Sequence, residues 1–296
     1  MAKHLVSPIV YMGSKRRLME QLMDEFPGDI DTFYDVFGGS GTVALNAPSQ
    51  HVLLNEFNTP VYQMHEYFIH TPFIEIQQDM QDLVVKYGDG KKLTEQQFKD
   101  LRDIYNKPQP EDRDVKILHL LVYFSFQKMF RFNQDGGFNT SFNNRVKSLP
   151  NRDYFSKLYS YSEVLLSKGV QLQNKDFRDI DYTALTSQDF VYFDPPYLIT
   201  ESMYNTGWGE QDDRDLYQLI QELDSRGIRF GLSNVIHHKG RTNHILKEFA
   251  EDPKYYVHRF NIVYDTYLGD KGVADVADEV YITNVASHEV APLIKF

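Results

Sequence analysis

The chain has 296 residues, of which 42% are hydrophobic and 25% charged, a balance typical of a folded globular protein rather than a disordered one. It contains no cysteine, which excludes disulfide bonds, thiolate metal sites, iron–sulfur clusters and a catalytic cysteine. Asp and Glu (42) outnumber Lys and Arg (31), so a nucleic-acid partner would need a locally basic surface.

No membrane segment is predicted. The longest strongly apolar stretch, Ile117–Phe126, contains a histidine and a serine and is too short to cross a bilayer. The first residues do not have the layout of a secretory signal, because their charged cluster follows the short apolar stretch. We therefore expect a cytoplasmic protein without a membrane partner.

The first predicted unit is a strand, a turn, a helix and a second strand. Phe33–Phe37 is a β-prone run that leads into the turn Gly38–Gly41, and residues 42–47 are typical of a helix. A second β-like run, His51–Leu54, is followed closely by the acidic residue Glu56. This order is the opening of a βαβ unit.

Residues from about 61 to 172 have a different pattern. Helical spacing of apolar residues extends over Glu95–Asn106 and Val115–Phe130, and a glycine- and asparagine-rich stretch follows at 132–144. The β/α alternation then resumes, with strand-like runs at 189–197, 229–234, 256–264 and 279–284 and a helix at 212–226. The sequence predicts a discontinuous α/β domain with a mostly helical domain inserted between its second and third strands.

The glycine-rich turn lies where a predicted strand ends and a helix begins. Glycines there let the backbone turn tightly and approach a ligand closely. The spacing is not G-x-G-x-x-G, so the turn does not match a dinucleotide-binding fingerprint. Glu56, after the next strand, suits a pair of ribose hydroxyls; the alternative is a plain turn with a surface glutamate.

The tetrapeptide Asp194-Pro195-Pro196-Tyr197 follows a buried-looking strand. Ligands of an open parallel sheet bind beyond the carboxyl ends of its strands, which puts the tetrapeptide at the ligand edge. Proline fixes the backbone and removes amide donors, so a carboxylate and a rigid carbonyl acceptor stand together and suit an NH₂ group. The tyrosine ring suits stacking on the heterocycle that carries the amine. The alternative is a proline-stiffened strand exit with an exposed tyrosine.

Together these motifs resemble those of the Dam-like DNA adenine-N6 methyltransferases, in the same order and over nearly the full chain. The matching segments are Tyr11–Leu18 (YMGSKRRL), Asp35–Gly41 (DVFGGSG), Asn55–Asn58 (NEFN), Asp176-Phe177 and Asp194–Tyr197 (DPPY). The resemblance implies a Rossmann-like class I methyltransferase sheet with an inserted, mostly helical target-recognition domain. The catalytic domain would comprise residues 1–60 and 173–296, and the inserted domain residues 61–172.

The resemblance also implies an S-adenosylmethionine site and no metal. Lys15 would contact the cofactor carboxylate, Glu56 the ribose, and Asp176 and Phe177 the adenine. Tyr11 stands where the family usually has tryptophan, and Glu56 where it usually has aspartate. The expected cofactor-binding residues are Tyr11, Lys15, Phe37, Gly38, Gly39, Ser40, Gly41, Glu56, Phe57, Asp176, Phe177 and Asp194.

The implied reaction is methyl transfer to the exocyclic N6 amine of adenine in double-stranded DNA. The expected catalytic residues are Asp194, Pro195, Pro196 and Tyr197. The Asp194 carboxylate and the Pro195 carbonyl would accept the two amine hydrogens as positive charge develops on the nitrogen. The base cannot be reached inside a duplex, so we expect it to be flipped out and stacked on Tyr197.

A basic, aromatic-rich segment at 128–147 offers a DNA-binding surface. It carries four basic residues and one acidic residue, and it resembles the recognition loop of the family. Arg131 is the expected base reader, because arginine binds guanine in a bidentate way. Further expected DNA-binding residues are Asn133, Asn139, Asn144, Arg145 and Lys147. The alternative is a solvated glycine-rich loop, and the DNA sequence that the protein recognises stays open.

A second segment, His237–Arg241, is expected to be a polar loop facing the DNA backbone.

The resemblance therefore implies a site-specific adenine DNA methyltransferase of a bacterium or of a phage in a bacterial host. A restriction endonuclease of the same system is a further expected partner, without a stable complex. Methylation of RNA adenine or of a protein glutamine stays open, because both amines suit a similar tetrapeptide. A non-catalytic DNA-binding module with a retained cofactor fold and a nicotinamide oxidoreductase are the remaining alternatives.

Overall fold

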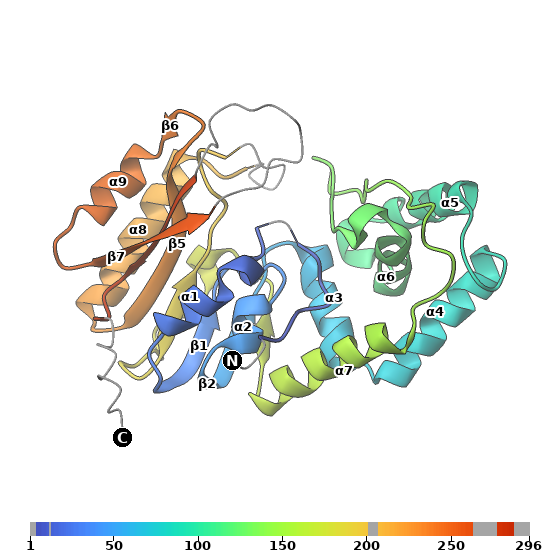
Figure 1. Ribbon diagram of the computed structural model, residues 1–296, viewed down its shortest axis with the longest axis horizontal. Helices are drawn as coiled ribbons and strands as arrows, with labels where there is room; N and C mark the ends of the chain where they lie inside the picture. Colours follow the sequence, from blue (N-terminus) through green and yellow to red (C-terminus); the bar gives the residue numbers. More distant parts are fainter. Residues whose placement is uncertain (1–3, 12, 201–206, 263–276, 287–296) are drawn as a thin grey trace, which may run out of the picture. The chain divides into compact units, whose positions relative to one another are not determined.

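The computed structural model describes residues 4–11, 13–200, 207–262 and 277–286 (Figure 1). Its eight strands form one sheet in the order β3-β2-β1-β4-β5-β8-β7, with the short β6 paired to β5. The strands are β1 (Ile30–Asp35), β2 (Ser49–Asn55), β3 (Gln171–Gln173), β4 (Phe190–Phe193), β5 (Arg229–His238), β6 (Arg241–Thr242), β7 (Tyr256–Ile262) and β8 (Ala277–Thr283).

The sheet combines parallel strand pairs with antiparallel pairs at one side. β2 pairs with β3, β1 with β4 and β4 with β5 in parallel, whereas β8 runs antiparallel to both β5 and β7. Parallel pairs need crossover connections, and helices supply them here. This mixed α/β architecture confirms the predicted fold class.

The order of the sheet creates a switch point between β1 and β4. These strands are hydrogen-bonded neighbours, with Asp35 opposite Tyr192, so their carboxyl ends lie side by side. Ligands of doubly wound sheets bind beside such a point. The residues that follow β1 and β4, Phe37 and Asp194, are therefore placed at adjacent strand exits.

The described helices at 42–46, 95–106, 115–124 and 210–225 lie on the ranges that the sequence predicts, with differences at some ends. They are α1 (Met19–Asp24), α2 (Thr42–Asn46), α3 (Thr59–His70), α4 (Phe73–Tyr87), α5 (Glu95–Asn106), α6 (Val115–Phe124), α7 (Arg152–Ser167), α8 (Glu210–Ser225) and α9 (His244–Ala250), with short 3₁₀ turns η1 (Lys15–Arg17), η2 (Pro110–Asp112), η3 (Phe126–Lys128) and η4 (Phe177–Asp179). No helix within the described ranges is both long and apolar enough to cross a membrane.

One helix prediction was wrong at its end. The helical pattern seen over Val115–Phe130 stops at Phe124, because Ser125 is extended and its hydroxyl donates to the Val122 carbonyl. Gln127 and Lys128 then adopt left-handed backbone conformations, with φ of 56° and 54°. The chain turns there into the segment that was predicted to read DNA.

The chain packs as two compact units. The first comprises residues 1–17, 38–46 and 52–175, and the second residues 18–37, 47–51 and 176–296. β3, which the sequence did not reveal, pairs with β2 and includes the expected boundary at residue 172. The functional division at residues 60 and 172 stays a prediction, since packing alone does not say which residues bind DNA.

In the first unit, α6 is a central helix. Every residue from Ile117 to Phe124 is buried, and α3, α4 and α5 pack around it. α5 begins with a capping box, in which Thr94 and Gln97 satisfy each other's backbone amides. This start signal and the apolar spacing explain why the predicted range of α5 is correct.

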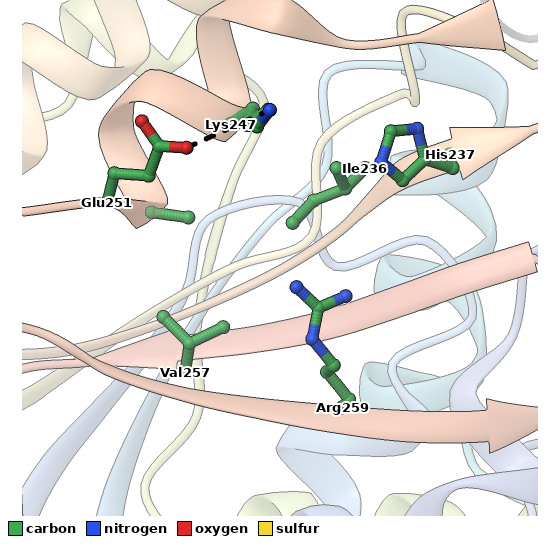
Figure 2. A pocket seen from close by; sticks show the side chains of 7 residues that line it. Ile236, His237, Lys247, Glu251, Val257 and Arg259 are labelled. Atoms are coloured by element: carbon green, nitrogen blue, oxygen red, sulfur yellow. Dashed lines mark ion pairs between the residues drawn. The ribbon is translucent and has the colours of Figure 1, made fainter.

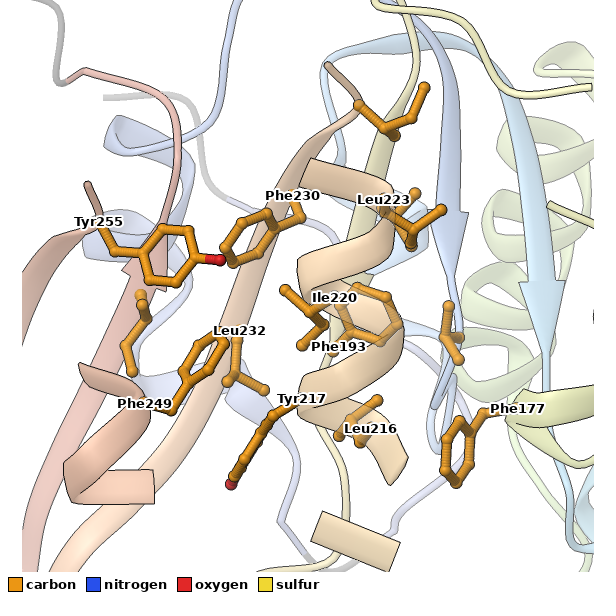
Figure 3. Packing of buried hydrophobic residues seen from close by; sticks show 14 of the residues in the cluster. Phe177, Phe193, Leu216, Tyr217, Ile220, Leu223, Phe230, Leu232, Phe249 and Tyr255 are labelled. Carbon is orange, nitrogen blue, oxygen red and sulfur yellow. The ribbon is translucent and has the colours of Figure 1, made fainter. Parts of the chain in front are cut away.

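In the second unit, α8 covers one face of the sheet (Figure 3). Its buried residues Leu216, Tyr217, Ile220 and Leu223 recur at the helical period and pack with side chains of β4 and β5, including Phe193. Burial of each such side chain stabilises the fold by roughly 1.5–3 kcal/mol. This packing fixes the strand from which the DPPY segment projects.

Candidate active site

The glycine turn is held close to the end of β2. The amide of Gly38 donates to the Asn55 carbonyl at 2.8 Å. A Cβ atom on Gly38 would lie 2.3 Å from Leu54 Cδ1 and 3.0 Å from the Asn55 oxygen, so a side chain has no room there. Gly39 and Gly41 have φ of 50° and 70°, in the left-handed region that favours glycine.

Glu56 lies directly against this turn. One carboxylate oxygen accepts the Gly39 amide at 2.7 Å and the other accepts the Asn58 amide at 2.7 Å. The residue is 7% exposed. Burial raises the pKa of the Glu56 carboxyl to about 7, against the opposing effect of the two backbone hydrogen bonds. The glutamate is thus oriented by the turn and charged only near neutral pH and above.

The N-terminal segment also meets the glycine turn. The Ser40 hydroxyl lies 2.8 Å from that of Thr42 and 3.5 Å from that of Ser14. Lys15 is buried on η1, which packs against α2, and Tyr11 is half-buried. Met12 of the same motif lies outside the described residues.

These residues fit the nucleoside part of the implied cofactor. A carboxylate can accept about four hydrogen bonds. On Glu56, the amides of Gly39 and Asn58 take two of these positions. The oxygens can therefore also accept hydrogen bonds from two ribose hydroxyls. The adjacent Phe57 is 69% exposed, and its ring is available to a planar base.

In the second unit, the DPPY segment leaves β4 with its aspartate half-buried. The Tyr197 hydroxyl lies 3.1 Å from Asp194 Oδ1 and 3.2 Å from Glu279 Oε1 on β8. Glu279 is only 3% exposed. Burial, followed by the negative charges of Asp194 and Glu279, raises the pKa of Tyr197 well above its ordinary value. The tyrosine therefore stays protonated and donates to a carboxylate.

Three aromatic rings meet beside the exit of β1. The Phe37 ring centroid lies 5.7 Å from that of Phe177 and 5.6 Å from that of Trp208, and the Phe177 and Trp208 centroids are also 5.6 Å apart. Trp208 donates its indole N–H to Asp213 at 2.8 Å. Trp208 is the single tryptophan of the chain, and no motif identified it from the sequence.

Asp176 forms hydrogen bonds and an ion pair with Arg178, two residues further along the chain. Its carboxylate accepts the Arg178 amide at 2.9 Å and caps η4. The Arg178 guanidinium also pairs with Asp212 and Asp215, both at 2.7 Å. Phe177 is buried in the hydrophobic cluster of the second unit. The adenine-binding roles of Asp176 and Phe177 stay predictions.

The expected DNA-reading segment is internally ordered. Arg131 donates from Nε to the Asn139 side-chain oxygen and from one terminal nitrogen to the Asn139 carbonyl, both at 2.8 Å. Asn133 closes a turn by accepting the Gly137 amide at 2.7 Å. The more exposed of the predicted DNA-binding residues are Asn133, Asn144, Arg145 and Lys147.

The aromatic residues of this segment divide into two groups. Phe130 and Phe138 are fully buried, so they belong to the core of the first unit and are not available to stack on bases. Phe132 packs on Phe138 at 6.0 Å and Phe142 on Phe98 at 5.4 Å between ring centroids. These contacts order the segment, and its role in reading DNA stays a prediction.

The expected polar loop at His237–Arg241 is a β-hairpin instead. β5 extends to His238 and pairs with β6, and the turn is made by Lys239 and Gly240 with φ of 48° and 72°. A hollow of about 200 Å³ lies next to it (Figure 2) and is lined by Ile236, His237, Lys247, Ala250, Glu251, Val257 and Arg259. Within the described ranges, no group of three or more His, Cys, Asp or Glu side chains is arranged to hold a metal ion.

The sheet order and the two sequence motifs, the glycine turn and the DPPY segment, each agree with the methyltransferase class. The model of the D12 class N6 adenine-specific DNA methyltransferases matches residues 11–264, and the chain belongs to this family. This finding confirms the resemblance seen in the sequence.

Three relatives are named as modification methylases or as a type II methyltransferase. The chain is 36% identical over 262 residues to modification methylase StsI of Streptococcus sanguinis, covering 84% of this chain and 38% of the relative. It is 32% identical over 292 residues to type II methyltransferase M.FokI of Planomicrobium okeanokoites, covering 96% and 44%. It is 31% identical over 290 residues to modification methylase LlaI of Lactococcus lactis subsp. lactis, also covering 96% and 44%. The chain thus spans about two fifths of the length of these relatives.

Among solved structures, precorrin-6y C5,15-methyltransferase from Geobacter metallireducens GS-15 matches 96% of this chain and 90% of its own. The TM-score is 0.36 and the sequence identity 13%, a likeness too weak to bear on fold or function.

Proposed function

We propose that the chain is a site-specific DNA methyltransferase that modifies the N6 amine of a flipped-out adenine in double-stranded DNA. The observation that carries this proposal is Asp194, which follows β4 at the switch point of the sheet and receives the Tyr197 hydroxyl. Membership of an adenine-N6 methyltransferase family supports the same assignment.

The DPPY segment provides acceptors for an amine. Asp194 accepts one hydrogen of the adenine amine, and the Pro195 carbonyl accepts the other. These contacts draw the nitrogen lone pair out of the ring and favour the positive charge that develops on N6. Correct alignment of the reacting atoms contributes on the order of 7–11 kcal/mol. Transfer would form the bond between N6 and the methyl carbon as the bond from that carbon to sulfur breaks. The proton lost from N6 would pass to the Asp194 carboxylate or to water.

The first unit provides the cofactor contacts. S-adenosylmethionine supplies an electrophilic methyl group on a sulfonium sulfur. Glu56 binds the ribose hydroxyls, Phe57 lies against the nucleoside, and Lys15 meets the carboxylate. Gly39 and Gly41, which have positive φ, let the backbone of the turn approach the bound molecule closely.

The segment at 128–147 supplies DNA recognition. Arg131 reads a base edge, held in place by its two hydrogen bonds to Asn139. Arg145 and Lys147 contact phosphates, since both are exposed. The names of the relatives place them in modification systems. A cognate restriction endonuclease is therefore the proposed biological partner, and the bacterial cytoplasm the proposed location.

Incubation with S-adenosylmethionine and unmethylated genomic DNA, followed by modification-sensitive sequencing, tests the proposal. We expect N6-methyladenine in one sequence context, and none with Asp194→Ala. Parallel reactions with total RNA and with a glutamine-containing protein substrate, read by tritiated methyl transfer, should give no product. Transfer to RNA or protein but not DNA would overturn the substrate assignment. Binding of DNA without any transfer would favour a non-catalytic module.

A further inference from the structure

A buried histidine and a buried tyrosine contact the glycine turn. His65, on α3, is fully buried, and its Nε2 lies 2.9 Å from the Gly39 carbonyl. Its Nδ1 lies 2.5 Å from the hydroxyl of Tyr161, on α7. A carbonyl only accepts, so Nε2 carries the hydrogen, Nδ1 accepts, and the Tyr161 hydroxyl donates. The geometry allows a single arrangement of hydrogens along this series of hydrogen bonds, from Tyr161 through His65 to Gly39.

Both polar groups of Gly39 are fixed by buried side chains. Its amide donates to Glu56 at 2.7 Å, and its carbonyl accepts from His65 at 2.9 Å. Gly39 therefore connects the histidine to the carboxylate assigned to the ribose. Rotation of this peptide would break both bonds at once.

The same two side chains lie against Gly41. A Cβ atom there would be 2.7 Å from the Tyr161 hydroxyl oxygen and 3.1 Å from His65 Cε1. The turn thus rests directly on the histidine–tyrosine pair. Burial lowers the pKa of His65 to about 4, so the ring stays neutral and this arrangement persists at neutral pH.

The pair belongs to helices that lie outside the cofactor motifs. α3 and α7 pack against each other and are the first and last helices of the inserted region at 61–172. We propose that His65 and Tyr161 are positioning residues for the cofactor turn, which fix the Gly39 peptide so that its amide orients Glu56 toward the ribose. This role rests on the proposed function, because it concerns S-adenosylmethionine binding.

The chain contains a matched control for this pair. His119, on α6, is also buried, and its Nε2 lies 2.7 Å from the hydroxyl of Tyr154, again on α7. The second pair has the same two side-chain types in the same unit. Among the described residues, His119 Nδ1 has no hydrogen-bond partner, and the contacts of the pair do not include the glycine turn. Loss of either pair removes a hydrogen bond to a buried histidine, but only the first should affect the cofactor.

Calorimetric titration of the full chain with S-adenosylhomocysteine, alongside urea unfolding, tests the proposal. We expect His65→Leu to raise Kd at least tenfold and Tyr161→Phe three- to tenfold. His65→Gln, which can donate to the Gly39 carbonyl, should stay within threefold of wild type. With DNA as substrate, KM for S-adenosylmethionine should rise as Kd does, while kcat at saturation changes less than threefold.

The controls His119→Leu and Tyr154→Phe should lower stability without changing Kd more than twofold. The proposal is overturned if Tyr161→Phe and His65→Leu bind as wild type does, or if the controls weaken binding equally. Tyr161→Phe removes one hydroxyl, so it keeps the test valid if His65→Leu does not fold. Absence of binding by the wild type would overturn the proposed function as well, whereas unchanged binding in the variants overturns this inference alone.

Discussion

Tyr197 directs its hydroxyl at Asp194, three residues before it, with 3.1 Å between the Tyr197 oxygen and Asp194 Oδ1. The same oxygen lies 3.2 Å from Glu279 Oε1, so two carboxylates share one hydroxyl hydrogen. The tyrosine of the motif thus orients the aspartate of the motif. Its ring also packs with Val235 and Ile199, which fixes the hydroxyl in place.

Asp194→Ala should remove nearly all methyl transfer and leave the fold intact. The substitution removes one acceptor for the amine, and loss of a single group that stabilises developing charge costs on the order of 10²–10³-fold in kcat. Tritiated methyl transfer to DNA measures the loss. Thermal unfolding should stay close to that of wild type, because the Tyr197 hydroxyl keeps its contact with Glu279. Normal turnover by this variant would remove Asp194 from the mechanism.

Tyr197→Phe should reduce kcat by about tenfold or more and lower stability by roughly 1–3 kcal/mol, because both carboxylates lose their shared donor. Tyr255→Phe is a suitable comparison. Tyr255 is also buried in the second unit and contacts a carboxylate, that of Asp224, at 3.4 Å. It should lower stability without reducing kcat. Equal activity of Tyr197→Phe and wild type would show that the hydrogen bond from Tyr197 is not required to orient Asp194 for catalysis.

The predictable parts of this protein are those with local signals. The turn Gly38–Gly41 and the DPPY segment have distinctive compositions at strand ends, and α5 has both a capping box and an apolar period. β3 was missed because three residues, Gln171–Gln173, are too few and too polar to form a recognisable run. The β5–β6 hairpin was missed because a lysine, Lys239, occupies a left-handed position that usually favours glycine or asparagine.

The contacts of His65 and Tyr161 with the glycine turn could not be predicted from the sequence, and the reason is different. His65 and Tyr161 are 96 residues apart, and each lies on a helix whose sequence explains only its own amphipathic face. Glu279 meets Tyr197 across 82 residues in the same way. Such pairs arise from tertiary packing and leave no periodic or motif signal in a single sequence.

Glu56 should make stability and cofactor binding depend on pH in opposite directions. Its pKa is raised to about 7 in the folded chain from 4.5, so the folded state binds a proton that the unfolded state has lost. Stability from this group is therefore lost as pH rises from about 4.5 through 7. Unfolding free energy should fall by roughly 1 kcal/mol between about pH 6 and pH 8, and this contribution should be absent in Glu56→Gln.

Cofactor affinity should rise over the same interval. Ribose hydroxyls donate to the ionised carboxylate, so S-adenosylhomocysteine should bind about tenfold more tightly at about pH 8 than at pH 6. Calorimetric titration measures this change, and Glu56→Gln separates it from titration of the ligand itself. Identical pH profiles for the variant and wild type would exclude Glu56 as the titrating group.

Arg131 and Arg145 should affect DNA binding in different ways. Arg131 is held by Asn139, as a residue that reads one base requires, whereas Arg145 is exposed, as suits a phosphate contact. Arg131→Ala should therefore reduce the difference in binding free energy between the target sequence and other duplexes by about 1–3 kcal/mol. Arg145→Ala should weaken binding to all duplexes and lower the slope of log K against log salt by about one.

Fluorescence anisotropy with labelled duplexes at several salt concentrations distinguishes these effects. Asn139→Ala is the informative companion, because it keeps the arginine but removes the side-chain oxygen that accepts from its Nε. It should reduce sequence preference in the same direction as Arg131→Ala, and by a smaller amount. If Arg131→Ala left the ratio of specific to non-specific affinity unchanged, the segment at 128–147 would not be the part of the chain that reads the sequence.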